Sequence, residues 1–346
     1  MWAEHQEITM AKNQYRIAVV GATTLLGKEI GDEIAESPLA SAITVLLDTG
    51  DASGTLESMG DEATFIQALE PAAFENLDVA IFADATMLRE HGRTARQFGA
   101  AVVDATGSVK WDDKAPIRSP LSGGSAPLDL ETSAVRVAHP VATMLALVLG
   151  GVSTVAPVRF AAATVLQPAS ENGRAALDEL QQQTVNLLSF QSVPTGEFDA
   201  QIAFNLLPSL GEAARVPLDV VQERIRSDFA VLSAGRLPEP MLQMVQAPVF
   251  HGFGVSLFLE FDRALTVDAL SAALQSEHLD LVSEEGDPPS NLASAGQGQV
   301  LLQIKPDADP ARFTVWMTAD NLKLAARTAV ACALELTRLR PLGIVQ

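Results

Sequence analysis

Hydrophobic and polar positions alternate along the first third of the chain in the pattern of βαβ units. Short runs rich in β-branched residues are separated by amphipathic segments, as in parallel strands joined by helices. The pattern predicts strands at residues 15–20, 43–47, 78–82 and 100–104. It predicts helices at residues 28–36 and 87–98. This order indicates an α/β fold with a Rossmann-like, doubly wound parallel sheet.

A stretch rich in Pro, Gly and Ser at residues 112–132 ends this pattern and predicts a domain boundary. Further strands are predicted at residues 158–165, 300–304 and 313–318, with 244–250 and 255–261 as a pair. Further helices are predicted at residues 173–188, 220–232, 267–275 and 321–340, and a long polar loop at 284–299. Because 346 residues exceed the size at which one core stops growing, two domains are expected.

Several features predict a cytoplasmic protein. Residues 1–14 are polar and lack the basic and apolar regions of a secretory signal. The uncharged stretch 140–158 contains Gly150, Gly151 and Pro157, so it predicts a buried helix, a turn and a strand rather than a membrane span. A single cysteine, Cys332, permits no intramolecular disulfide and no multi-thiolate metal site.

The charge balance is strongly acidic. The chain has 23 Lys and Arg against 43 Asp and Glu, a formal net charge of -20. Such a surface repels phosphodiester backbones and anionic lipid headgroups. We therefore expect neither nucleic acid nor membrane as a partner.

A glycine-containing turn follows the first predicted strand and leads into the first helix. It comprises Gly21, Ala22, Thr23, Thr24, Leu25, Leu26 and Gly27. A strand, a glycine turn and a helix N-terminus together form a site for a pyrophosphate. Gly21 permits the tight turn and Gly27 permits close helix packing, but Thr24 replaces the middle glycine. The turn predicts dinucleotide binding, with the approach of the pyrophosphate hindered at Thr24.

Acidic residues follow the second predicted strand, at Asp48 and Asp51. A carboxylate at this place bonds a ribose 2′-hydroxyl and repels a 2′-phosphate. NAD is therefore favoured over NADP if a dinucleotide binds. The alternative is that both residues are ordinary turn residues.

Segments spread over nearly the whole chain resemble the aspartate-semialdehyde dehydrogenase family. They are Gly21-Ala22-Thr23 with Gly27, Asp104 after a strand, Phe204-Asn205-Leu206-Leu207-Pro208, Ala247-Pro248-Val249 with Gly252, and Asp320-Asn321-Leu322-Lys323. The run 198–207 is most similar to the Usg-type homologues, which are grouped with the family and lack its catalytic cysteine.

The resemblance implies three parts. Residues 14–135 would form the dinucleotide-binding domain, 136–319 an α+β catalytic and dimerisation domain with a mixed sheet, and 320–346 a helix that returns to the first domain. It also implies a homodimer, with Asn321 among the cofactor-binding residues. In active members a cysteine thiolate attacks aspartate 4-semialdehyde, hydride passes to NADP, and phosphate releases aspartyl phosphate.

The family's catalytic positions match poorly here. The nucleophile position falls on Ala142, or on Val141 if the alignment slips by one. Gln246 replaces the arginine that binds the substrate carboxylate, and Phe253 replaces the catalytic histidine. Gln167 matches the glutamine that orients the intermediate. Only Cys332 carries a thiol, and its apolar helix predicts a small core residue.

Other family positions leave alternatives open. His251 lies two residues before Phe253, and in a strand it would share that face. The family's substrate- or phosphate-binding lysine aligns with Glu223, although Arg224 is a possible substitute. Lys110 either matches a basic phosphate-binding residue or is a solvated lysine.

Three hypotheses follow. The leading one is a non-catalytic homodimer that binds a nucleotide, a metabolite or a protein in a cleft lined by Gln167, Asn205 and Asn321. The second is an enzyme of altered chemistry that uses His139 or His251 as proton carrier. The third is an active NAD(P)-dependent semialdehyde dehydrogenase of amino-acid biosynthesis, which requires Cys332 in the cleft.

Overall fold

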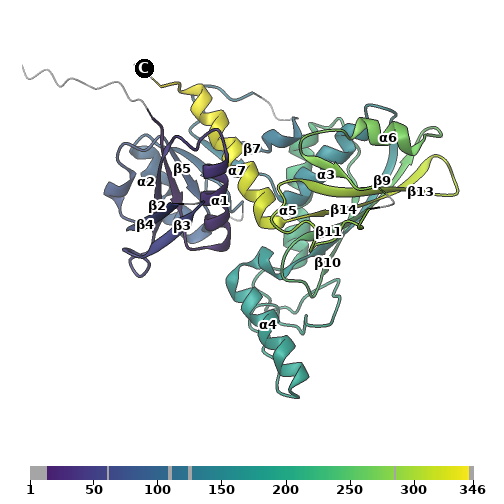
Figure 1. Ribbon diagram of the computed structural model, residues 1–346, viewed down its shortest axis with the longest axis horizontal. Helices are drawn as coiled ribbons and strands as arrows, with labels where there is room; N and C mark the ends of the chain where they lie inside the picture. Colours follow the sequence, from purple (N-terminus) through teal and green to yellow (C-terminus); the bar gives the residue numbers. More distant parts are fainter. Residues whose placement is uncertain (1–13, 61, 108–110, 124–126, 284–285, 343–346) are drawn as a thin grey trace, which may run out of the picture.

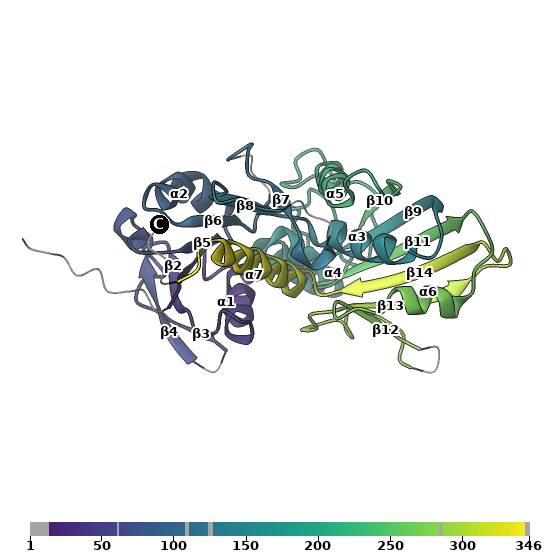
Figure 2. The same cartoon turned by 90° about the horizontal axis from the view of Figure 1, so that it is seen from above.

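The computed structural model describes residues 14–60, 62–107, 111–123, 127–283 and 286–342, and it contains two β-sheets. Figure 1 shows the first sheet at the left and the second at the right, with helix α7 (Asn321–Leu339) between them. Figure 2, seen from above, shows the same arrangement. The last helix therefore lies between the two halves of the chain.

The first sheet has eight strands in the order β3-β4-β2-β1-β5-β6-β8-β7. Their bounds are β1 Arg16–Val20, β2 Ile43–Asp48, β3 Leu56–Met59, β4 Glu62–Ala68, β5 Val79–Phe82, β6 Ala101–Asp104, β7 Ile117–Arg118 and β8 Ala134–Val137. All neighbours are parallel except β3 and β4, which are antiparallel. The predicted Rossmann-like parallel sheet is confirmed. The edge strand β3 and its neighbour β4 were not predicted, because exposed and less exposed residues alternate in them, and they lack the apolar run of a strand buried on both faces.

Both faces of the first sheet are covered. Alternate residues of the central strands face opposite sides, so Ile17 and Val19 pack with α1 (Leu25–Glu36) and α7. Ala18 and Val20 pack on the other side, with α2 (Ala85–Gln97) and the 3₁₀ helix Pro71–Phe74. Burial on both faces explains the continuous hydrophobic runs of these strands.

The second sheet is mixed, with six strands in the order β10-β9-β11-β14-β13-β12. Their bounds are β9 Val158–Gln167, β10 Met241–Gln246, β11 Phe253–Phe261, β12 Leu279–Leu281, β13 Val300–Pro306 and β14 Arg312–Ala319. One face packs against α3 (Pro140–Val152), α5 (Leu218–Ser233) and α6 (Val267–Ala273). The predicted mixed sheet is confirmed.

One predicted strand pairing is wrong. The segments 244–250 and 255–261 do not pair, because β9 lies between β10 and β11. The connection between them crosses the end of β9, where Ala247 N–H donates to the Gln167 carbonyl at 3.0 Å. Ala169 N–H donates to the Val249 carbonyl at 2.9 Å. These backbone bonds replace the hairpin turn that closeness in sequence suggests.

The uncharged stretch forms α3, a turn and β9, as predicted. Among the described residues, no helix is both long and apolar enough to cross a membrane. Residues 286–299 contain no regular strand or helix, and 284–285 lie outside the described residues. Helix α4 (Arg174–Leu188) projects from the second half of the molecule (Figure 1).

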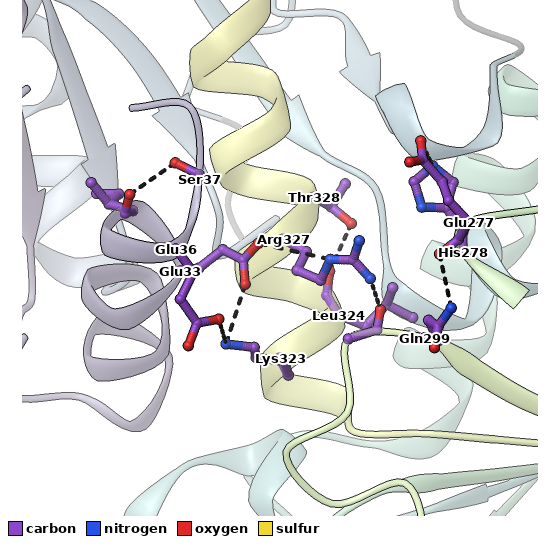
Figure 3. Close-up of polar contacts among 12 residues, drawn as sticks. Glu33, Glu36, Ser37, Glu277, His278, Gln299, Lys323, Leu324, Arg327 and Thr328 are labelled. Carbon is purple, nitrogen blue, oxygen red and sulfur yellow. Dashed lines mark hydrogen bonds and ion pairs between the residues drawn. The ribbon is translucent and has the colours of Figure 1, made fainter. Parts of the chain in front are cut away.

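A charged cluster joins α7 to α1 and to the second half (Figure 3). The Lys323 ammonium lies 3.2 Å from Glu33 and 3.1 Å from Glu36. Arg327 lies 3.7 Å from Glu33 and also donates to the carbonyl of Gly298. Because Glu33 belongs to α1 and Gly298 precedes β13, this cluster connects the two halves through α7.

Candidate functional site

The predicted phosphate turn has the backbone that a pyrophosphate site needs. Gly21 has φ +84°, a left-handed conformation, and its N–H donates to the Leu47 carbonyl at 2.9 Å. A Cβ on Gly27 would lie 2.1 Å from the Gly21 oxygen, so only glycine fits there. Thr24 caps α1, its Oγ1 accepting from Gly27 N at 2.9 Å. Both predicted glycine roles agree with the geometry.

The Asp48 carboxylate holds this turn in place. Asp48 is 2% exposed, and its Oδ2 accepts from both the N–H and the Oγ1 of Thr23 at 2.8 Å. Its Oδ1 accepts from Thr49 N at 2.7 Å. The carboxylate therefore fixes the turn to the end of β2, while Asp51 is exposed. The ribose contact stays a prediction.

The start of α1 faces the second half of the chain. Leu25 packs against an apolar cluster that includes Leu177 and Phe198. Helix geometry leaves the N–H groups of Leu25 and Leu26 without acceptors inside α1. The residues of the turn thus fit a dinucleotide pyrophosphate at the helix N-terminus, beside the seam between the two halves.

The residues predicted to occupy the family's nucleophile position lie in the first turn of α3. Val141 and Ala142 are both fully buried, in the same core cluster as Phe253. Neither side chain carries a nucleophilic atom. Cys332 lies elsewhere, fully buried in the core between α7 and the first sheet. Burial raises the pKa of its thiol, which disfavours the reactive thiolate.

His139 is the N-cap residue of α3. Its Nδ1 accepts from Val141 N at 3.1 Å, so the proton of a neutral ring is on Nε2. The Nε2 atom lies 3.2 Å from Glu171 Oε1. The His139 N–H donates to Asp228 at 2.8 Å, and the ring packs on Phe253 at 5.5 Å. His139 is fully buried, and its Nε2 makes no hydrogen bond with the described residues, so its role as a proton carrier stays a prediction.

Glu171 is the centre of a polar network. Burial by itself raises the pKa of this carboxyl, but contacts with His139, Arg224 and Asn321 outweigh burial and hold the pKa below its usual value. Glu171 follows β9, whereas Arg224 comes from α5 and Asn321 from α7. Sequence reasoning missed Glu171, since no local motif indicates partners so distant along the chain.

Arg224 also approaches two buried carboxylates. Its Nε lies 3.6 Å from Asp228, and its guanidinium occupies the space beside Gly107 where a Cβ would lie. Asp104 is fully buried and accepts from Thr106 and Gly107 with one oxygen. Burial raises the Asp104 pKa, against the effect of these bonds and of Arg224. The side chain of Arg224 therefore points into the network, while Glu223 is exposed. Lys110 lies outside the described residues.

The residues at the ends of β9 and β10 pair with each other. Gln167 and Gln246 are fully buried, and Gln167 Nε2 lies 3.4 Å from Gln246 Oε1. Gln246 Nε2 donates to the carbonyls of Gln167 and Ala247, at 3.0 and 3.2 Å. The Gln246 amide thus donates to main-chain carbonyls. Because glutamine is uncharged, it offers no positive charge to a substrate carboxylate.

Strand alternation does not place His251 on the same face as Phe253. His251 precedes β11, which begins at Phe253, and Gly252 between them has φ +84°. Strand alternation therefore does not extend back to His251. Phe253 is fully buried, whereas His251 is half-buried.

The two predicted asparagines lie in different surroundings. Asn321 is 1% exposed; its Oδ1 accepts from Ser170 at 3.0 Å and from Gly252 N at 3.1 Å. It joins the network around Glu171. Asn205 is exposed, and its side chain bonds the backbone of its own turn. The structure does not bring Asn205 together with the other site residues.

Comparisons with known proteins agree with this architecture. Residues 16–122 match the family model for the semialdehyde dehydrogenase NAD binding domain, and residues 152–324 match the model for the dimerisation domain. A USG-1 protein homologue from Pseudomonas aeruginosa is 26% identical over 90% of this chain and 94% of its own length. An aspartate-semialdehyde dehydrogenase from Rickettsia bellii is 25% identical over 94% of this chain and 98% of its own.

Solved structures show the same fold. The structure of a probable aspartate-semialdehyde dehydrogenase from Pseudomonas aeruginosa has a TM-score of 0.82 at 24% identity, covering 95% of this chain and 100% of that one. Aspartate semialdehyde dehydrogenase II from Vibrio cholerae has a TM-score of 0.78 at 21% identity, covering 94% and 99%. Because the two family models together extend from the first strand to the start of α7, this chain belongs to the aspartate-semialdehyde dehydrogenase family.

Proposed function

We propose that this chain is a non-catalytic member of its family: a homodimer that binds a dinucleotide or a related metabolite in a scaffold or regulatory role. The observation that carries the proposal is the buried Ala142 at the nucleophile position of α3. Covalent catalysis in the family needs a thiolate there, because the hydride donor is the adduct that the thiolate forms. Cys332, in the core beside the first sheet, is no substitute.

The neighbouring residues support loss of catalysis. Gln246 offers no positive charge to a substrate carboxylate, and Phe253 offers no proton. His139 has its Nδ1 occupied by Val141 N and its Nε2 directed at Glu171, which argues against altered chemistry through this histidine. The site retains the family's framework without its reacting groups.

The dinucleotide would be held by the turn between β1 and α1. The N–H groups of Leu25 and Leu26 would receive the pyrophosphate, with Gly21 and Gly27 allowing its approach. When bound, the dinucleotide would supply a nicotinamide ring, but nothing at Ala142 would form the adduct that donates hydride to it. We propose NAD over NADP because the acidic side chain of Asp48 disfavours a 2′-phosphate.

The homodimer would form through the second sheet, within the matched dimerisation domain. The face opposite α3 and α5 carries apolar side chains at its surface, with Phe160 40% and Met241 67% exposed. Phe160 also packs on Phe258 of the neighbouring strand β11. An exposed apolar face of this kind is typical of an interaction surface.

The test is an assay at 340 nm with aspartate 4-semialdehyde, phosphate and NAD or NADP, beside an active family member. We expect no turnover by this chain. Turnover that survives in a Cys332→Ala variant would show that another group serves as nucleophile, and turnover lost in that variant would assign the reaction to Cys332. Either result would overturn the proposal.

Binding is tested separately, by thermal unfolding with NAD and with NADP. We expect NAD to raise the unfolding temperature, since a ligand that binds only the folded state stabilises it. Because the Asp48 carboxylate also holds the turn, Asp48→Asn should weaken the binding of both dinucleotides and reduce the preference for NAD. If neither dinucleotide changes the unfolding temperature, the dinucleotide part of the proposal is wrong.

A further inference from the structure

A cavity of about 550 Å³ lies at the edge of the first sheet where β8 begins. Its walls are α2, the segment after β6 and the segment before β8. The phosphate turn follows the carboxyl end of β1, whereas this cavity lies at the amino end of β8. Because β1 and β8 belong to the parallel part of the sheet, the phosphate turn and the cavity lie at opposite ends of the strands. The cavity is therefore separate from the family's site.

An aromatic ring and an ion pair give one wall a fixed shape. Trp111 packs on α2 at Gly92, where a Cβ would lie 3.2 Å from the ring. The Arg96 guanidinium lies 5.9 Å from the Trp111 ring centre and is paired with Asp112. The Trp111 Nε1 is buried and has no acceptor among the described residues. An unpaired buried donor is unfavourable unless a ligand or water completes it.

Apart from the Arg96–Asp112 pair, the positive and negative side chains of the cavity lie on different walls. Arg93 on α2 and Lys114 after β6 are positive. Asp129 and Glu131, both before β8, are negative. Arg96 and Asp112 neutralise each other. The cavity thus presents two cations, one from α2 and one from the segment after β6, and two anions from the segment before β8.

This division selects for the charge pattern of the ligand. A simple anion would meet Asp129 and Glu131, and a simple cation would meet Arg93 and Lys114. In a molecule that has a carboxylate at one end and an ammonium group near it, the carboxylate can pair with the cationic side chains and the ammonium with the anionic ones. No like charges then face each other. A volume of several hundred cubic ångströms is in the range of small-molecule sites.

We propose that this cavity binds a free α-amino acid. The carboxylate contacts Arg93 and Lys114, the ammonium contacts Asp129 and Glu131, and the side chain lies toward Trp111. This site does not depend on the proposed loss of catalysis or on dinucleotide binding.

The test is isothermal titration calorimetry of the full chain with each of the L-amino acids found in proteins, at millimolar concentration. Butyrate and butylamine serve as probes that carry only the anion or only the cation. Variants are Glu131→Gln and the double variant Arg93→Gln with Lys114→Gln. Arg174→Gln, at an exposed position on α4, is the matched control. Circular dichroism verifies that each variant is folded.

We expect at least one amino acid to bind, with butyrate and butylamine binding roughly tenfold more weakly or not at all. Both wall variants should lower the affinity by roughly tenfold or more, and Arg174→Gln should not. Absence of binding by every amino acid would overturn the proposal. Equal binding of butyrate, or affinity unchanged in folded wall variants, would overturn it as well.

Discussion

At the scale of single residues, the candidate site combines buried amides with apolar side chains at the positions predicted for the family's reacting groups. Gln167 stays buried at the end of β9, although Ala142 has no thiol for it to serve. The Gln246 amide bonds main-chain carbonyls, and Phe253 packs on His139.

Glu171 provides a test at this scale. Because its pKa is lower in the folded protein than in the unfolded chain, its charge stabilises the folded state above its ordinary pKa of 4.5. That contribution is lost as the pH falls from 4.5 through the lower folded pKa. We expect Glu171→Gln to destabilise the protein by about 1–3 kcal/mol at pH 7 and by less in acid. Urea unfolding across pH measures this.

The matched control is Asp178→Asn on α4, where the carboxylate is 60% exposed and paired with Arg174. Such a surface pair contributes about 0–1 kcal/mol. A difference between Glu171→Gln and wild type that is constant from neutral pH to acid would contradict the assigned charge role.

Gly27 gives a second residue-scale prediction. A Cβ there would lie 2.1 Å from the Gly21 oxygen, which belongs to the backbone and must move. We expect Gly27→Ala to destabilise the protein by about 1–3 kcal/mol and to weaken dinucleotide binding. Gly150→Ala is the control, because a Cβ at Gly150 meets no atom within 4 Å. Thermal unfolding should show a lower midpoint for Gly27→Ala and an unchanged or higher one for Gly150→Ala.

At the scale of elements, α7 is the piece that joins the two halves. Its first turns carry Lys323 and Arg327 toward α1, and its later turns place Cys332 in the core of the first sheet. Glu335 of the same helix accepts from Arg118 at 2.8 Å, which fixes α7 to β7. Helix α7 thus begins at the seam and ends on the first sheet.

The pairing of α7 with α1 is tested by Lys323→Met. The Lys323 side chain is 11% exposed and Glu33 is 14% exposed, so the variant removes the nearer of the two cations beside a nearly buried carboxylate and leaves Arg327 at 3.7 Å. We expect a loss of about 1–3 kcal/mol in the free energy of unfolding. Adding Glu33→Gln should restore part of it, because the remaining charge is then removed. Arg226→Ala, in an exposed pair, should cost about 0–1 kcal/mol.

Urea unfolding of the single and double variants measures the coupling. Additive effects of Lys323→Met and Glu33→Gln would show that the two side chains do not interact, against the contact at 3.2 Å.

At the scale of the whole molecule, the arrangement of the two sheets decides where ligands and partners bind. The phosphate turn faces the seam, where Leu25 contacts the cluster that packs beneath α4. The exposed face of the second sheet lies on the opposite side from α3 and α5. Nucleotide binding and dimer formation would therefore use different surfaces of the same fold.

The proposed dimer is tested by the double variant Phe160→Asp with Met241→Asp. Charges on this apolar face are costly to bury, so we expect the dimer to dissociate at concentrations where the wild type stays paired. Sedimentation equilibrium measures the mass. Leu292→Asp is the control, because Leu292 is also exposed, at 82%, but lies in the loop before β13. Dissociation by Leu292→Asp alone would place the interface elsewhere.

Much of the fold could be predicted from the sequence, because it depends on the chemistry of neighbouring residues. Apolar runs of the right length predicted the central strands of the first sheet, since both faces of that sheet are buried. Gly21 and Gly27 indicated the turn, because no other residue type fits their backbone geometry. The buried helix α3 followed from its uncharged sequence, with Gly150 and Gly151 in its last turn and Pro157 after it.

The tertiary structure alone decided the rest, because it depends on contacts between distant segments. Whether β10 and β11 pair was settled by β9, which lies between them and supplies hydrogen bonds to both. The contacts of His139 with Glu171 and Asp228 join three elements that no local pattern connects. Periodicity reports which face of an element is buried, whereas a network of side chains depends on how those faces meet.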